Sequence, residues 1–97
     1  MVYGVEYEVP GDAELYGQVK MAIGDDHPDG LLVHLVVKTA AGLRHTEVWT
    51  SIEQQARFHH ERVEPAVHGV LTSLGFTEAP PEPATAELVL VDVVTGS

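Results

Sequence analysis

Residues 46–58, TEVWTSIEQQARF, decide the fold of this chain, because a predicted strand runs here directly into the longest predicted helix. Ser51 and Gln54 have the Ser-x-x-Gln spacing of a capping box, in which each residue hydrogen-bonds the other's backbone, so the helix is expected to begin after Ser51. Thr50 and Glu53 offer the same pairing one residue earlier. The junction also contains the only tryptophan, Trp49.

The composition favours a small protein with one core. A chain of 97 residues is long enough for a single domain, here residues 1–97. It contains no cysteine, so disulfides and thiolate chemistry are excluded. The net charge of −10 argues against nucleic acid and anionic membranes as partners. The start of the chain lacks the features of a signal peptide, and no apolar run is long enough to span a membrane, so a cytoplasmic location is predicted.

Outside the junction, the pattern of apolar residues predicts three more strands and one more helix. The helix is expected between an N-cap at Asp12 and a terminating Gly24. Pro65 predicts a kink in the long helix or the start of a second helical piece, and Gly75 with Phe76 predicts its end. The proline-rich residues 78–84 are expected to form an extended linker. The four strands are predicted at residues 2–9, 31–39, 43–50 and 87–95.

The order of these elements, β-α-β-β-α-β, predicts a ferredoxin-like α+β sandwich, with a four-stranded antiparallel sheet and both helices on one face. The strands at 31–39 and 87–95 are apolar on both faces. Two helices cover only one face, so the other face would expose a large apolar patch, which in a small protein usually marks an interaction surface. The sequence therefore predicts a homodimer joined through its sheets.

The connection between the two central strands determines which side chains meet. A two-residue loop at Ala41-Gly42 is the simplest interpretation, because glycine readily adopts the positive φ of such turns. His34 would then lie opposite Trp49, and Lys38 would lie opposite His45. A slip of one residue would place His34 on the other face of the sheet.

The junction resembles a known family signature. Val48-Trp49-Thr50-Ser51, an acidic and amide-rich first turn and Phe58, preceded by a Gly-containing hairpin, are similar to the strand-to-helix signature of the antibiotic-biosynthesis-monooxygenase-like dimeric α/β-barrel superfamily. The resemblance implies that two ferredoxin-like units pack sheet to sheet into a barrel, with a cavity between sheet and helices in each protomer. Members include cofactor-independent monooxygenases, haem-degrading enzymes and isomerases, so the resemblance bears on architecture more than on reaction.

Two groups of residues are candidates for a site. His34, Glu47 and Trp49 are predicted to share a sheet face, with His45 nearby; a histidine oriented by a carboxylate can serve as a general base beside an aromatic wall. The alternative is that His34 is a hydrogen-bonded core residue and Trp49 fills the sheet interface. The same residues could in principle bind a metal ion, but no dense histidine and carboxylate motif at ligand spacing is present, so no metal is predicted.

The second group lies on the long helix, whose predicted core-facing arc contains polar residues. They either line a pocket between helix and sheet or extend their polar ends to the edge of the arc. Three tyrosines, on the first strand and first helix, could wall such a pocket or simply pack in the core. The candidate residues of this group are Gln55, Phe58, His59, Arg62, Tyr3, Tyr7 and Tyr16.

Three functional hypotheses follow. The resemblance implies a cofactor-independent monooxygenase, or a binder of a small aromatic or polyketide-like molecule, with His34 or His59 as proton acceptor. The alternative is a non-catalytic dimeric binding or structural module. A further alternative is a haem-binding or haem-degrading relative, for which His68 would be the family's helical histidine; however, Phe58 stands where that branch is expected to have Trp.

Two further motifs are more simply explained without chemistry. The loop at residues 25–29 could bind a cation through its carboxylates, although charged turn residues are usually only solvated. Ser51 has the spacing of a helix cap and not of a nucleophile.

Overall fold

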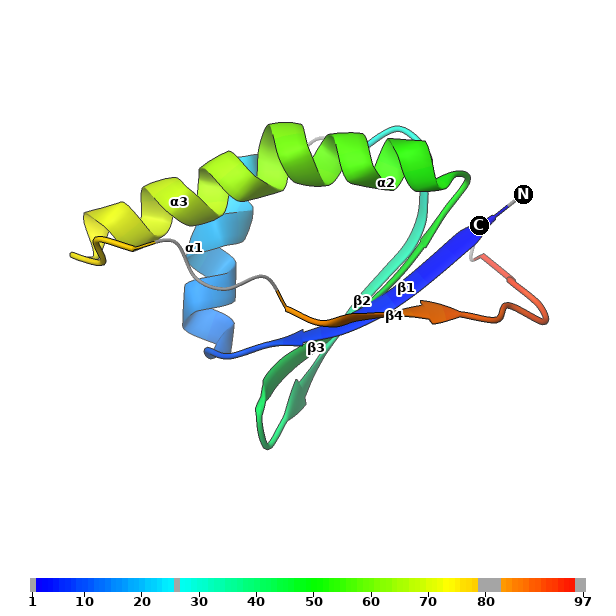
Figure 1. The fold of residues 1–97 in the computed structure, drawn as a ribbon, viewed down its shortest axis with the longest axis horizontal. Coiled ribbons are helices and arrows are strands. Elements are labelled where there is room, and N and C mark those ends of the chain that lie inside the picture. The colour runs from blue at the N-terminus through cyan, green and yellow to red at the C-terminus, as the bar shows by residue number, and fades with distance from the viewer. Residues whose placement is uncertain (1, 26, 79–82, 96–97) are drawn as a thin grey trace.

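The computed structural model describes residues 2–25, 27–78 and 83–95, and within them one antiparallel sheet carries the helices on one face (Figure 1). The strand order is β2-β3-β1-β4, which is compatible with a ferredoxin-like fold. The predicted order of elements is confirmed when α2, η1 and α3 are counted as one interrupted helix. The elements are β1 (Tyr3–Val9), α1 (Ala13–Ile23), β2 (Leu31–Thr39), β3 (Gly42–Trp49), α2 (Ile52–Phe58), η1 (His59–Val63), α3 (Glu64–Ser73) and β4 (Thr85–Leu88).

The predicted N-caps at Asp12 and Ser51 are confirmed, although the Gln54 side chain accepts from the Ser51 hydroxyl and does not complete the predicted capping box. The Asp12 carboxylate accepts a hydrogen bond from the Leu15 amide at 2.9 Å and starts α1. Ser51 Oγ accepts from the Gln54 amide at 3.2 Å and starts α2. After α3, the Phe76 amide donates to the Leu71 carbonyl, which together with the positive φ of Gly75 forms a Schellman-type end. Local sequence therefore sets where each helix begins and ends.

The long helix is interrupted by a π-helical turn, η1, immediately before Pro65. The Glu64 amide donates to the carbonyl of His59, five residues earlier. Proline has no amide hydrogen and its ring crowds the carbonyl four residues before it. The wider π turn accommodates Pro65 in the first turn of α3, and Figure 1 shows α2, η1 and α3 as one continuous helical segment. Such π turns occur frequently at functional sites.

The predicted hairpin register is wrong by two residues. Thr39 pairs with Gly42, so the loop is Ala40-Ala41, and His34 lies opposite Glu47 and not Trp49. Gly42 still provides the only positive φ of the connection, 144°, but it does so directly after the loop. A shift of two residues preserves which face each side chain occupies, so His34 remains on the predicted face.

Replacement of Gly42 by alanine is expected to destabilise the hairpin by about 2 kcal/mol or more. A Cβ atom there would adopt an unfavourable φ and collide with the carbonyl oxygen of Val9. Gly69→Ala is the matched control, because an added Cβ meets no atom within 4 Å and a helical alanine should add about 0.5–1 kcal/mol. Urea unfolding of both variants measures the difference, and equal effects would contradict the assigned turn.

The last strand is shorter than predicted and begins earlier. It spans Thr85–Leu88 and not residues 87–95, because its partner ends first: Leu88 pairs with Gly4, and β1 begins at Tyr3. In this register the residues after Val89 lie beyond the first residue of β1, Tyr3. Three valines of residues 89–95 are open to solvent, with Val89 94%, Val91 97% and Val94 83% exposed. Residues 79–82 of the predicted linker lie outside the described residues.

The two faces of the sheet differ in character. Tyr7, His45 and Glu47 face the helices, whereas Leu35 and Val37 of β2 lie on the opposite face and are 53% and 37% exposed. The buried apolar core is small and consists of Val5, Leu43, Val48, Trp49, Ala66 and Val70. No helix in the described residues has the length and apolar character needed to cross a membrane.

Candidate functional site

A network of polar and aromatic side chains occupies the helix-facing side of the sheet. Glu47 lies at its centre: its Oε2 accepts a hydrogen bond from the Tyr7 hydroxyl at 2.6 Å, and its Oε1 accepts one from Trp49 Nε1 at 2.8 Å. His34 Nε2 lies 3.9 Å from Glu47 Oε2 and 3.1 Å from His45 Nδ1. The register places these residues together, because Tyr7 pairs with His45 across β1 and β3, and His34 pairs with Glu47 across β2 and β3.

Aromatic rings hold the two histidines in place. The Tyr7 and His45 rings stack with centroids 4.8 Å apart and planes within 6°. Tyr16 of α1 meets both histidine rings edge-on, at 5.5 Å for His45 and 6.5 Å for His34. His45 and Glu47 are buried, whereas the His34 side chain remains 27% exposed. The network is therefore reached from solvent through His34.

Burial shifts the titration of the histidines. It lowers the pKa of His45 to about 4, with a further lowering from the neighbouring His34. It also lowers the pKa of His34, although the Glu47 carboxylate opposes this shift. The pKa of Tyr7 is raised, first by burial and then by the charge of Glu47. Both imidazoles are thus neutral at pH 7, and one ring N–H is shared between His34 and His45.

The stability of the protein should fall as the pH falls from about 6.5 to about 4. In this window an unfolded His45 binds a proton and the folded one does not, so protons favour unfolding. We expect His45 to account for a loss of about 1–2 kcal/mol, less than the full shift implies because water reaches the neighbouring His34. The check is the unfolding free energy at several pH values in the presence of a chelator. The variant His45→Gln should show a flatter pH dependence, and an identical dependence would contradict this account.

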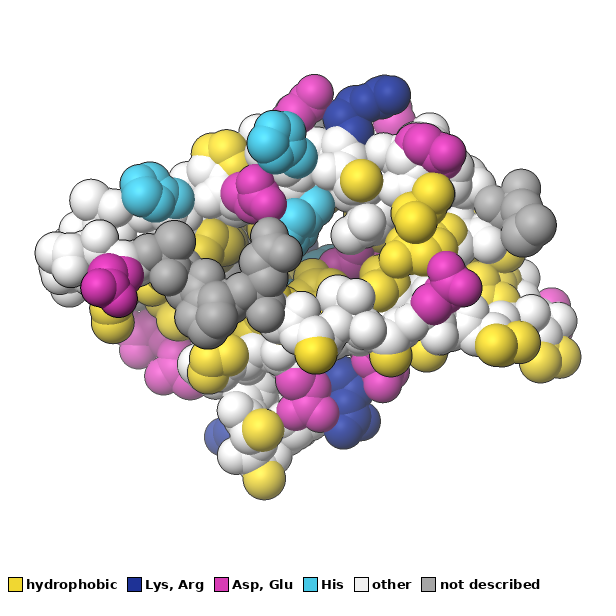
Figure 2. All heavy atoms as spheres, in the orientation of Figure 1, with side chains coloured by type: hydrophobic (Ala, Val, Ile, Leu, Met, Phe, Trp, Pro, Cys, Tyr) yellow, Lys and Arg dark blue, Asp and Glu magenta, His cyan; other side chains and the backbone are white. Residues whose placement is uncertain are grey.

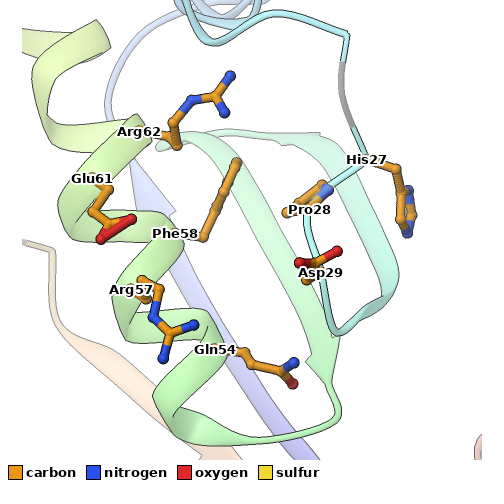
Figure 3. A pocket seen from close by; sticks show the side chains of 8 residues that line it. All are labelled: His27, Pro28, Asp29, Gln54, Arg57, Phe58, Glu61 and Arg62. Atoms are coloured by element: carbon orange, nitrogen blue, oxygen red, sulfur yellow. The ribbon is translucent and has the colours of Figure 1, made fainter.

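A pocket of about 260 Å³ lies beside this network, between α2, η1 and the loop before β2. Figure 3 shows the ring of Phe58 in the space between the helix and the sheet, with Arg57 and Arg62 on the helix and His27 and Asp29 across from them. The rings of Phe58 and Trp49 are 5.7 Å apart, so these two aromatic residues separate the pocket from Glu47. Figure 2 also shows a hollow between the helical layer and the sheet, with histidine and acidic side chains at it.

The structure brings together some of the predicted site residues and separates others. His34, Tyr7, Glu47 and Trp49 form the network, and Phe58 contacts it through Trp49. Arg62 lines the pocket and donates to the Ile23 carbonyl.

Tyr16 also packs against the two histidines, whereas His59, Gln55 and His68 are not among the residues bonded to Glu47 or His34 in the network. His59 lies 3.8 Å from Glu64 on its own helical segment, and Gln55 is half-buried on α2. His68 is exposed on α3. Of the second group, Phe58 and Arg62 line the 260 Å³ pocket, whose histidine is His27 and not His59.

Sequence reasoning gave too little weight to His45. It is a full member of the network, in hydrogen-bond contact with His34 and stacked on Tyr7. The available signal was the spacing of His45 and Glu47, because residues two apart on a strand share a face. Gln54, Arg57 and Asp29, which line the pocket, were also missed, since loop and helix side chains meet there without a sequence pattern.

The network contains a set of metal-ligand atoms. One atom from each of His34, His45 and Glu47 lies within 4.8 Å of the others. Sequence spacing did not reveal this set, because His45 and Glu47 lie on β3 whereas His34 lies on β2. Among the described residues, every buried side-chain nitrogen and oxygen has a hydrogen-bond partner.

Comparison with known proteins identifies neither a family nor a function for the chain. No protein-family model and no curated protein matches the chain.

Proposed function

We propose that the chain forms a homodimer through the open face of its sheet, and that each protomer binds a small, flat, largely apolar molecule beside the His34 network. An aromatic or polyketide-like molecule fits this description. The observation that carries the proposal is the part-buried Tyr7–Glu47 hydrogen bond with two neutral histidines beside it. Buried polar groups of this kind contribute little net stability to a core, and they cluster at functional sites.

His34 is the proposed proton acceptor, because its side chain is partly exposed while its ring faces the rest of the network. A neutral imidazole can take a proton from an acidified C–H or O–H group of the bound molecule. The resulting imidazolium would be stabilised by the Glu47 carboxylate, 3.9 Å away, and by its hydrogen bond with His45. Tyr7 and Trp49 hold that carboxylate in position.

The reaction we propose is that of a cofactor-independent monooxygenase, as the resemblance to the antibiotic-biosynthesis-monooxygenase-like superfamily implies. Loss of a proton from a substrate CH₂ group gives a carbanion that is oxidised by O₂ to a hydroperoxide. Loss of water then leaves a ketone, so one oxygen atom enters the product, the other enters water, and the CH₂ group supplies all four electrons that reduce O₂. No external reductant, flavin or metal takes part. A cytoplasmic location stays a prediction.

The test is oxygen uptake with a panel of hydroxylated polycyclic aromatics in the presence of a chelator, while Trp49 fluorescence reports binding. We expect His34→Gln to reduce kcat/KM by at least about 100-fold, the scale of a lost general base. His60→Gln is the control, since the side chain of His60 is 82% exposed. Equal activity of the two variants would contradict the role of His34. Solution mass measured across dilution tests the dimer, and a stable monomer at micromolar concentration would contradict it.

A non-catalytic dimeric binding module is the second candidate. It is favoured by the complete pairing of the buried polar side chains among the described residues. Its signature would be ligand-dependent Trp49 fluorescence without oxygen uptake. The haem-related alternative is less well supported, because His68 is exposed while Ala66 and Val70 are the buried residues of α3.

A further inference from the structure

We propose that His34, His45 and Glu47 bind a divalent transition-metal ion, with Zn²⁺ as the representative ion. The inference does not depend on the proposed proton transfer, since it concerns the free protein. It starts from the register of the sheet, which places two histidines and a carboxylate on one face of β2 and β3. Two imidazoles and a carboxylate are the donor set that borderline ions such as Zn²⁺ and Fe²⁺ prefer, whereas Mg²⁺ and Ca²⁺ prefer oxygen.

The distances are close to those of an occupied site. Ligands at about 2.1 Å from a tetrahedral ion are separated from one another by about 3.4 Å. His34 Nε2 lies 3.1 Å from His45 Nδ1 and 3.9 Å from Glu47 Oε2, and no pair of the three donor atoms is more than 4.8 Å apart. Small movements of the partly exposed His34 side chain suffice to bring the donors around one ion.

The groups around the three donors are those that usually support metal ligands. The hydroxyl of Tyr7 and the indole N–H of Trp49 hold the two oxygens of Glu47, which leaves each oxygen a free lone pair. The ring of His45 is fixed by stacking on Tyr7. Hydrogen bonds and packing of this kind orient ligands before the ion arrives, and their loss typically weakens metal binding by about 10- to 100-fold.

The fourth coordination position would face solvent through His34, whose side chain is 27% exposed. Three protein ligands with an open position are typical of reactive metal centres and not of closed structural sites. The net charge of −10 further favours cation binding. A bound ion would occupy the lone pair of His34, so metal binding and proton acceptance by this residue would exclude each other.

The experiment is titration of the chelator-treated protein with Co²⁺, followed by its visible absorption, and then displacement of Co²⁺ by Zn²⁺. We expect one ion per chain with an absorption typical of low coordination number. Removing a ligand with His45→Gln or Glu47→Gln should weaken binding by more than about 100-fold, and Tyr7→Phe should weaken it by about tenfold. No substrate is required, so the outcome is independent of oxygen uptake.

The matched control uses a second group of two histidines and a glutamate, which lies on the long helical segment. His59 and His60 both approach Glu64 on the helix, at 3.8 Å and 3.2 Å. His60→Gln should leave the affinity unchanged. Loss of binding in that variant, or equal affinity in His45→Gln and the unaltered protein, would overturn the proposal, as would the absence of Co²⁺ binding at millimolar ion. Circular dichroism confirms folding, and His34→Gln provides a partly exposed alternative should the buried variants fail to fold.

Discussion

Replacement of Trp49 by alanine is expected to destabilise the protein by about 3–5 kcal/mol, which is a large part of the stability of a chain of this size. Trp49 is 1% exposed and is the largest fully buried side chain. Its ring contacts Phe58, and its indole N–H donates to Glu47. The substitution therefore removes the contact between the sheet and α2 and leaves Glu47 with one donor fewer. Urea unfolding or circular dichroism measures the loss.

Trp49→Phe separates the two contributions. It keeps an aromatic ring against Phe58 but removes the indole N–H, so we expect a loss of about 1–2 kcal/mol. A change of less than about 1 kcal/mol on Trp49→Ala would show that the ring is not at the centre of the core.

Replacement of Glu47 by leucine is expected to destabilise the protein by about 3–5 kcal/mol, although leucine is apolar and the site is buried. The side chain loses both acceptor oxygens, so the Tyr7 hydroxyl and the Trp49 N–H are left without the partner they have now. Chemical denaturation measures the loss.

Glu47→Gln is the matched variant. Its amide oxygen can accept from Trp49, and its amide N–H can donate to the Tyr7 oxygen, so we expect roughly half the loss. If glutamine and leucine had equal effects, hydrogen bonding would not be the role of Glu47 in stability.

The helix boundaries could be predicted because they depend on local chemistry. Asp12 and Ser51 provide side-chain acceptors for exposed amides, and Gly75 provides the φ of 95° that ends α3. The interruption before Pro65 was predictable as a break but not as a π turn. Whether the break becomes a π turn depends on how α3 packs after Pro65, which the local sequence does not specify.

The hairpin and the last strand could not be placed from sequence alone. Gly42 has a positive φ, but the pattern does not say whether such a glycine lies within a two-residue loop or directly after it. Residues 87–95 have the composition of a strand, yet a strand also needs a partner, and β1 starts too late to pair with Val91 or the residues after it. Both errors concern how strands pair with one another, and not the tendency of either segment to form a strand.

The candidate site was predictable in part. His34, Glu47 and Trp49 were expected on one face, and the error of two residues in the register did not change that face. The hydrogen bond between His34 and His45 depends on the corrected register, because His45 lies only two residues before Glu47, the partner of His34. The pocket beside Phe58 depends on how the loop before β2 meets α2, which no periodic pattern encodes.

The central claim is that buried His45 and partly exposed His34 are kept against the helix-facing side of the sheet for binding and chemistry and not for stability. The most direct measurement is the unfolding free energy of the double variant His34→Leu with His45→Leu. The His34–His45 hydrogen bond is part-buried, and replacing both partners of such a bond by apolar residues of similar size is often neutral or stabilising. We predict a stability equal to or higher than that of the unaltered protein. A loss of more than about 2 kcal/mol would contradict the claim and assign the pair to packing.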